Sequence, residues 1–222
     1  MAAFDAAWAC GAPWIETDVQ VTSDLVPVLI HDDTLERTTD GSGPVGAQTA
    51  HNLATLDAGS WFGPGYGGAR IPELSELAGT LTAGRRLLLE IKGEHTREAV
   101  LAEIEVLRAA GTDEYAFLQS FEIPALRLVR DIQPDRPVGL LVEALHPDPV
   151  AMCGELGAIA YNPHHLLLRE RPELVAELHA ARIATFVWTA DEPADWRFLT
   201  DLGVDGIITD DPAALRAWQA QT

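Results

Sequence analysis

The sequence is poor in lysine. Lys92 is the only lysine among 15 basic residues, which face 34 acidic residues, and the formal net charge is −19. Because this charge repels phosphate backbones, the composition argues against non-specific binding of nucleic acid. An anionic substrate would need a local cation. Lys92 is therefore a candidate for that role, although a solvated surface lysine is the simpler interpretation.

Cysteine and long apolar segments are also scarce. The two cysteines, Cys10 and Cys153, are too few for a disulfide-stabilised scaffold and form no closely spaced metal-binding pair. No apolar run is long enough to cross a bilayer, and residues 1–20 do not have the pattern of a signal peptide. We expect a soluble, cytoplasmic protein without stable membrane insertion, unless an upstream signal peptide has been lost with the N-terminus.

Short apolar segments rich in β-branched residues alternate with helical segments. The length of 222 residues is close to that of one barrel, so we expect a single domain over residues 1–222. The βα order predicts an α/β fold of the TIM-barrel type. The predicted strands are 14–20, 26–30, 87–91, 116–118, 138–142, 159–161, 185–188 and 206–208, and the clearest predicted helices are 96–110, 123–132 and 172–182.

The first two predicted strands are too close in sequence for a parallel crossover, so they are predicted to form a hairpin. A two-residue turn at Asp24 and Leu25 would place His31 opposite Asp18. Glu16 lies two residues before Asp18, on the same face of the strand. The hairpin therefore predicts that Glu16, Asp18 and His31 converge.

The remaining predicted strands do not complete a closed barrel. Without the antiparallel strand at 26–30, seven parallel strands remain, one fewer than the eight of a closed barrel. Residues 1–10 resemble a helix without an N-cap or a preceding strand. We expect the first strand to be missing from this chain. Residues 32–72, rich in Gly, Pro, Ser and Thr and containing Phe62, form a long excursion after the second strand. It is predicted to be a rim or lid over the barrel mouth, or an ordinary surface loop.

Charged side chains occur at the carboxyl ends of two predicted strands, where barrel enzymes carry their functional groups. Glu16 and Asp18 share one strand face, and Glu90 and Lys92 repeat the spacing. Crowded carboxylates repel one another unless a cation keeps them ionised. Ion pairs with arginine on the barrel rim would be a purely structural alternative. The three carboxylates favour one hard divalent cation, Mg²⁺ or Ca²⁺, and the lack of a Cys or His cluster argues against zinc.

This set of residues predicts phosphodiester chemistry. A metal ion and Lys92 would neutralise a phosphodiester and the additional charge of its transition state. His31 would carry a proton, as a base toward the nucleophile or an acid toward the leaving group. We expect the other histidines to be structural or solvated.

Several segments together resemble the glycerophosphodiester phosphodiesterase family, and the resemblance covers the whole chain. The most specific are residues 14–22, Trp-Ile-Glu-Thr-Asp-Val-Gln-Val-Thr, and residues 28–39, Val-Leu-Ile-His-Asp-Asp-Thr-Leu-Glu-Arg-Thr-Thr. Further matches are 56–62, 71–74, 89–92, 119–121, 187–189 and 203–210.

The resemblance implies an eight-stranded barrel that hydrolyses a small-molecule glycerophosphodiester to an alcohol and glycerol 3-phosphate. It also implies roles for individual residues. Glu16, Asp18 and Glu90 would bind the metal, His31 would be the acid/base group, and Lys92 would contact the phosphate and support catalysis. The substrate would also contact Trp188 and Phe62.

One family feature is absent from this sequence. Members of the family normally begin with a strand that carries His-Arg-Gly, followed by Pro-Glu-Asn-Thr, and neither motif occurs here. We expect a start codon assigned too late or a truncated chain. Loss of general acid/base catalysis typically costs about 10²-fold to 10⁴-fold in rate. The exposed strand edges of an incomplete barrel would also favour a homodimer or strand exchange.

Three alternatives remain open from the sequence. The chain could be a truncated relative that binds metal and phosphate without turnover. It could be a phospholipase-D-like lyase that forms a cyclic phosphate. An unrelated phosphate-binding barrel is less consistent with the residues, because it would not need three converging carboxylates.

Overall fold

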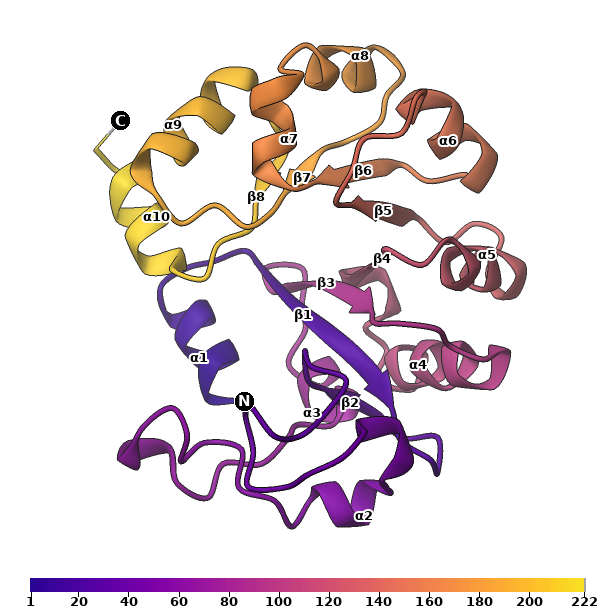
Figure 1. The fold of residues 1–222 in the computed structure, drawn as a ribbon, viewed down its shortest axis with the longest axis vertical. Coiled ribbons are helices and arrows are strands. Elements are labelled where there is room, and N and C mark those ends of the chain that lie inside the picture. The colour runs from indigo at the N-terminus through magenta and orange to yellow at the C-terminus, as the bar shows by residue number, and fades with distance from the viewer. Residues whose placement is uncertain (222) are drawn as a thin grey trace.

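Strands and helices alternate in the computed structural model, which describes residues 1–221 (Figure 1). The strands are β1 (Trp14–Val21), β2 (Pro27–Leu29), β3 (Arg86–Ile91), β4 (Ala116–Ser120), β5 (Val138–Val142), β6 (Ala160–Pro163), β7 (Phe186–Val187) and β8 (Gly206–Ile207). The α-helices are α1 (Ala2–Ala9), α2 (Ala50–Leu53), α3 (Leu74–Ala78), α4 (Arg97–Ala109), α5 (Ile123–Ile132), α6 (Pro149–Leu156), α7 (His165–Glu170), α8 (Leu174–Ala180), α9 (Pro193–Leu202) and α10 (Pro212–Gln219).

The strands follow one another around the centre of the molecule, and the helices lie outside them (Figure 1). Six strands form a sheet in the order β2-β1-β3-β4-β5-β6, in which only β2 is antiparallel to its neighbour. The parallel pair β7-β8 continues this sheet through bridges from Ala160 to Ala184 and from His164 to Trp188. The α/β fold with a parallel sheet is as predicted. Among residues 1–221, no helix is both long and apolar enough to cross a membrane.

Alternation along the strands separates two apolar layers. In β3, Leu87 and Leu89 join the large core shared with the helices, to which α4 contributes Ile104 and Leu107. Leu88 belongs instead to a small cluster with Phe117 and Ala160, from β4 and β6. Because side chains alternate with a period of two, Glu90 extends on the same face as Leu88, toward the inside of the curved sheet.

The hairpin register differs from the prediction by one residue. Val19 faces Leu29, and the backbone N–H of Ile30 donates to the carbonyl of Asp18, so Ile30 rather than His31 lies opposite Asp18. The cause is the turn. Leu25 adopts a left-handed φ of 62°, which gives a three-residue loop in place of the predicted two-residue turn.

The excursion at residues 32–72 shares a small core with the hairpin arm that precedes it. It contains two 3₁₀ turns, Val45–Ala47 and Pro64–Tyr66, as well as α2. Asp57 organises its tip, because the carboxylate accepts hydrogen bonds from the backbone N–H groups of Gly59, Ser60 and Gly68. The buried core residues are Val28, Ile30, Leu35, Val45, Leu53 and Ile71.

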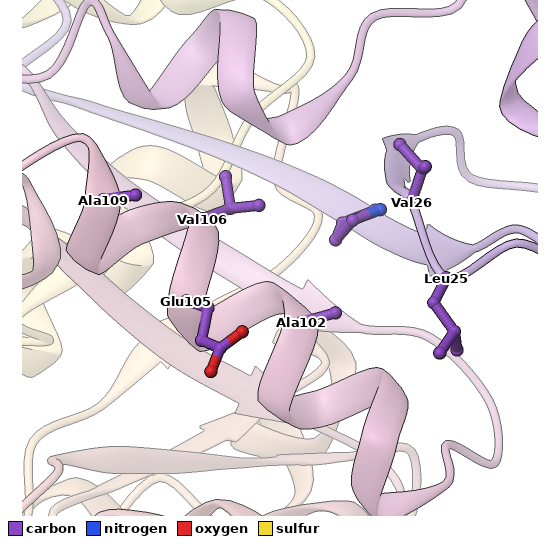
Figure 2. Close-up of a pocket in the computed structure, with 7 residues that line it drawn as sticks. Leu25, Val26, Ala102, Glu105, Val106 and Ala109 are labelled. Atoms are coloured by element: carbon purple, nitrogen blue, oxygen red, sulfur yellow. The ribbon is translucent and has the colours of Figure 1, made fainter.

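The left-handed turn residue provides a test of the hairpin. Leu25 is 48% exposed and lines a shallow groove of about 380 Å³ between the turn and α4 (Figure 2). We expect Leu25→Ile to lower the free energy of unfolding by about 1 kcal/mol, because a β-branched residue is strained at positive φ. Leu25→Asn, which tolerates this conformation, should cost less. Urea denaturation measures both changes.

Leu101 supplies the matched control, since it is also a partly exposed leucine but lies within α4. Leu101→Ile should cost only a few tenths of a kcal/mol, about the difference in helix propensity. Equal losses at the two positions would contradict the strained turn.

Candidate active site

Two parallel strands position the acidic residues. In the register of β1 with β3, Glu16 pairs with Leu88 and Asp18 pairs with Glu90. Glu90 is therefore directly beside Asp18, and Glu16 is two residues earlier on the same face. The pairing of β1 with β3 explains why residues 72 positions apart in the sequence share one site.

Glu16, Asp18 and Glu90 form a compact carboxylate cluster. Each offers an oxygen, and the three oxygens lie within 4.8 Å of one another. Asp18 and Glu90 are buried, while Glu16 is half-buried. Three converging oxygen ligands fit a hard divalent cation, with other shell positions open to water or substrate. The predicted convergence of the carboxylates agrees with the geometry, and they could hold a metal ion.

Two carboxyl groups of the carboxylate cluster have raised pKa values. Burial is the main cause at Glu16, and the charges of Asp18 and Glu90 add to it, so that the pKa of Glu16 rises to about 8. Burial, followed by the charge of Asp18, raises the pKa of Glu90 to about 7. Both carboxyl groups thus resist ionisation in the absence of a cation, which supports the fit to a metal ion.

Lys92 and His31 lie beside the carboxylate cluster. The Lys92 ammonium is 3.4 Å from Asp18 Oδ1 and 3.4 Å from Glu90 Oε1. Burial opposes its charge, but the two carboxylates outweigh burial and raise the pKa of Lys92. Its Nζ is also 3.1 Å from His31 Nε2. The predicted approach of His31 to the acidic residues therefore occurs, through Lys92, despite the different hairpin register.

The neighbours of His31 indicate which of its ring nitrogens carries the proton. A lysine ammonium can only donate, so His31 Nε2 accepts from Lys92 and the ring proton lies on Nδ1. Nδ1 is 2.8 Å from Asp32 Oδ1, and Arg37 donates to both oxygens of Asp32. Hydrogen bonding to Arg37 holds the pKa of Asp32 well below its usual range. Asp32 and Arg37 thus orient an exposed imidazole whose Nε2 is a proton acceptor.

A chain of amides leads from the carboxylate cluster across the strands. Gln119 Nε2 donates to Glu16 Oε1 at 3.2 Å, and Asn162 Nδ2 donates to Gln119 Oε1 at 2.8 Å. Asn162 Oδ1 accepts from the backbone N–H of Phe186 at 3.0 Å. Gly139 leaves space for the Asn162 amide, because a Cβ at position 139 would lie 2.9 Å from Asn162 Nδ2. The amides fix the orientation of Glu16.

Two predicted substrate contacts have different surroundings. Trp188 follows β7 and is anchored by a hydrogen bond from Nε1 to the carbonyl of Asn162 at 2.9 Å. Its ring contacts Phe121 and His164 at centroid distances of 5.3 and 4.9 Å. Phe62 is 68% exposed in the excursion, and its ring contacts are with Trp61 and Tyr66. Their contact with substrate stays a prediction.

Four residues of this site had no predicted role. Gln119 and Asn162 have a detectable signal, because each lies at or near the carboxyl end of a strand. Asp32 and Arg37 lie beyond β2 in irregular chain, where spacing alone does not predict that their side chains meet. Only their proximity to His31 in the sequence pointed toward the site.

Comparisons with known proteins find phosphodiesterases that resemble this chain over most of its length. The model of the glycerophosphoryl diester phosphodiesterase family matches residues 1–214. A glycerophosphodiester phosphodiesterase of Caldanaerobacter subterraneus subsp. tengcongensis is 36% identical over 218 residues, which cover 97% of this chain and 89% of that protein. One from Bacillus subtilis is 28% identical over 94% of this chain and 77% of its own length.

Solved structures show the same fold. A phosphodiesterase of Oleispira antarctica, solved in complex with the product sn-glycerol-3-phosphate, has a TM-score of 0.93 and 27% identity, over 99% of this chain and 90% of its own. A glycerophosphodiester phosphodiesterase of Agrobacterium tumefaciens has a TM-score of 0.83 and 28% identity, over 96% and 90% of the two chains. These matches support the predicted TIM-type barrel fold class.

The raised pKa values predict how stability depends on pH without divalent cations. Unfolding returns Glu16 and Glu90 to a carboxyl pKa of about 4.5, below their folded values of about 8 and about 7. Between these limits the folded protein binds more protons than the unfolded chain, so rising pH favours unfolding. We expect the free energy of unfolding in chelator to fall from pH 5 to pH 8, measured by urea denaturation.

Glu16→Gln should flatten this pH dependence, because the amide does not titrate. Glu155→Gln makes the same change of charge at an exposed position of α6 and controls for general repulsion in an acidic protein. If both variants follow the wild-type profile, the pKa of Glu16 is not raised as described.

Proposed function

Because the chain belongs to the glycerophosphoryl diester phosphodiesterase family, we propose that it uses one divalent cation to hydrolyse glycerophosphodiesters to an alcohol and glycerol 3-phosphate. The family and the enzyme class were both predicted correctly from the sequence. The observation that carries the proposal is the carboxylate cluster with Lys92 and His31 beside it. The product complex of the Oleispira antarctica relative supports the glycerol phosphate part of the substrate.

The proposed metal ligands are Glu16, Asp18 and Glu90, and the proposed ion is Mg²⁺ or Ca²⁺. Oxygen-only donors favour these hard cations over zinc. When bound, the cation would polarise a phosphoryl oxygen and offset the negative charge of the transition state. Burial of the carboxylates strengthens this proposal, since the protein would otherwise hold repelling groups together.

His31 and Lys92 would act on the phosphodiester. His31 presents an accepting Nε2, oriented by Asp32, and can take a proton from an attacking water or return one to the leaving alkoxide. Lys92 lies between this imidazole and the carboxylates, where its ammonium can contact a non-bridging phosphate oxygen. Both side chains would serve one phosphoryl group.

Residues farther from the carboxylate cluster would recognise the rest of the substrate. We include Trp188 as a glycerol contact, because its ring is held in place by Asn162, Phe121 and His164. Phe62 and the rest of the 32–72 excursion would form a rim over the mouth of a barrel that comprises one domain. Exposed aromatic rings on an ordered loop are consistent with substrate contact.

The activity test uses glycerophosphocholine as substrate, with Mg²⁺ or Ca²⁺ added after treatment with a chelator. We expect activity to depend on the added cation and Glu16→Gln to lower kcat/KM at least about 100-fold, because a neutral amide replaces an anionic ligand of the cation. Phosphorus NMR should identify glycerol 3-phosphate as the product.

Glu155→Gln is the control of matched charge, and it should retain wild-type activity. Equal activity of wild type and Glu16→Gln would contradict the metal site. A folded protein that binds the cation without turnover would support an inactive relative, and a cyclic phosphate product would support a lyase.

A further inference from the structure

Glu103 is a fully buried carboxyl group outside the carboxylate cluster. It lies on the inner face of α4 among apolar neighbours of the same helix, and its exposed fraction is 0%. Burial raises its pKa, and His95 opposes that effect. A buried carboxyl group is costly unless it has a partner, so its position calls for an explanation.

The only ion-pair partner of Glu103 within the described residues is His95. His95 Nδ1 lies 2.7 Å from Glu103 Oε1, and the His95 side chain is 6% exposed. The two atoms are at contact distance without forming a hydrogen bond, and neither has a hydrogen-bond partner elsewhere along residues 1–221. Each group therefore depends on the other for compensation in the interior.

His95 belongs to the short connection between β3 and α4, which begins with Lys92. Gly93 has a left-handed φ of 74°, and Gly93, Glu94 and Thr96 are exposed. His95 thus carries the one deeply buried side chain in the connection between Lys92 and α4. The connection carries Lys92 at one end and is anchored to the helix by His95.

We propose that the His95–Glu103 pair is a positioning device for Lys92. The pair fixes the path of residues 93–95, and this path sets where the Lys92 ammonium lies relative to Asp18, Glu90 and His31. At the strand end, the backbone N–H of Lys92 donates to the carbonyl of Val19 at 3.2 Å. The connection is therefore held at both ends. The catalytic value of Lys92 rests on the proposed function, but the position of its ammonium does not.

The scarcity of lysine permits a direct test. Lys92 is the only lysine, so protein labelled with ¹³C-lysine gives a single Cε signal from this residue. The signal reports the environment of the ammonium without any need for catalysis. We expect His95→Ala to shift or broaden it relative to wild type, because the buried anchor of an otherwise exposed connection is lost.

Glu103→Gln is the conservative variant, since the amide has the shape of the carboxyl group and keeps a polar atom beside His95 Nδ1. Its lysine signal should stay near that of wild type, whereas Glu103→Leu should shift it as His95→Ala does. Leu107→Ala, on the same face of α4 but away from the connection, controls for destabilisation and should leave the signal unchanged. An unshifted signal in folded His95→Ala would overturn the proposal, as would an equal shift in Leu107→Ala.

Activity then separates this inference from the proposed function. In an active protein, His95→Ala should lower kcat/KM about 10-fold, in the range expected for residues that orient a functional side chain without touching the substrate. This loss should vanish in a Lys92→Ala background. If His95→Ala lowers kcat/KM by the same factor in the Lys92→Ala background, His95 does not act by positioning Lys92. If wild type proves inactive, the proposed function fails, while the lysine signal still decides the inference.

Discussion

Mutual repulsion among three carboxylates in one partly buried site is the constraint on which the surrounding structure depends. Glu16, Asp18 and Glu90 place oxygens within 4.8 Å of one another, and burial removes much of the water that would screen them. The structure offsets only part of this repulsion. Lys92 supplies one positive charge, and Gln119 donates one hydrogen bond to Glu16. The remaining repulsion is what a divalent cation would relieve.

The fold supplies the geometry that this constraint requires. The register of β1 with β3 fixes the distance between Asp18 and Glu90, and the helices outside the strands hold that register through the large core. Outward-facing leucines of β3 pack against the helices, while Glu90 turns inward. The His95–Glu103 contact extends the same arrangement by tying the connection after Lys92 to α4. Packing on one face of the sheet thus positions the charges on the other.

Much of the fold was predictable because it depends on local patterns. The strand at 138–142 and the helix at 123–132 have the predicted bounds, since apolar runs and a following Gln-Pro pair define them. The spacing of Glu16 with Asp18 and of Glu90 with Lys92 also placed these residues on one face. The one-residue error in the hairpin arose from Leu25, because a leucine gives no sequence signal for positive φ.

The rest of the site was not predictable because it depends on tertiary contacts. The link from Asn162 through Gln119 to Glu16 joins residues 146 positions apart, and the burial of Glu103 depends on how α4 packs. Asp32 and Arg37 meet only because of the irregular path after β2. The family resemblance added the reaction class, which the geometry alone does not define.

Calorimetric titration of the chelator-treated protein with Mg²⁺ and Ca²⁺ measures whether the carboxylates require a cation. We expect one ion to bind per chain. Binding at pH 6 should also release protons, detected by comparing buffers of different ionisation enthalpy, because Glu16 and Glu90 have pKa values of about 8 and about 7. Proton release should decline by pH 9. Absence of binding, or binding of the same affinity in Glu16→Gln, would contradict a cation site built on these carboxylates.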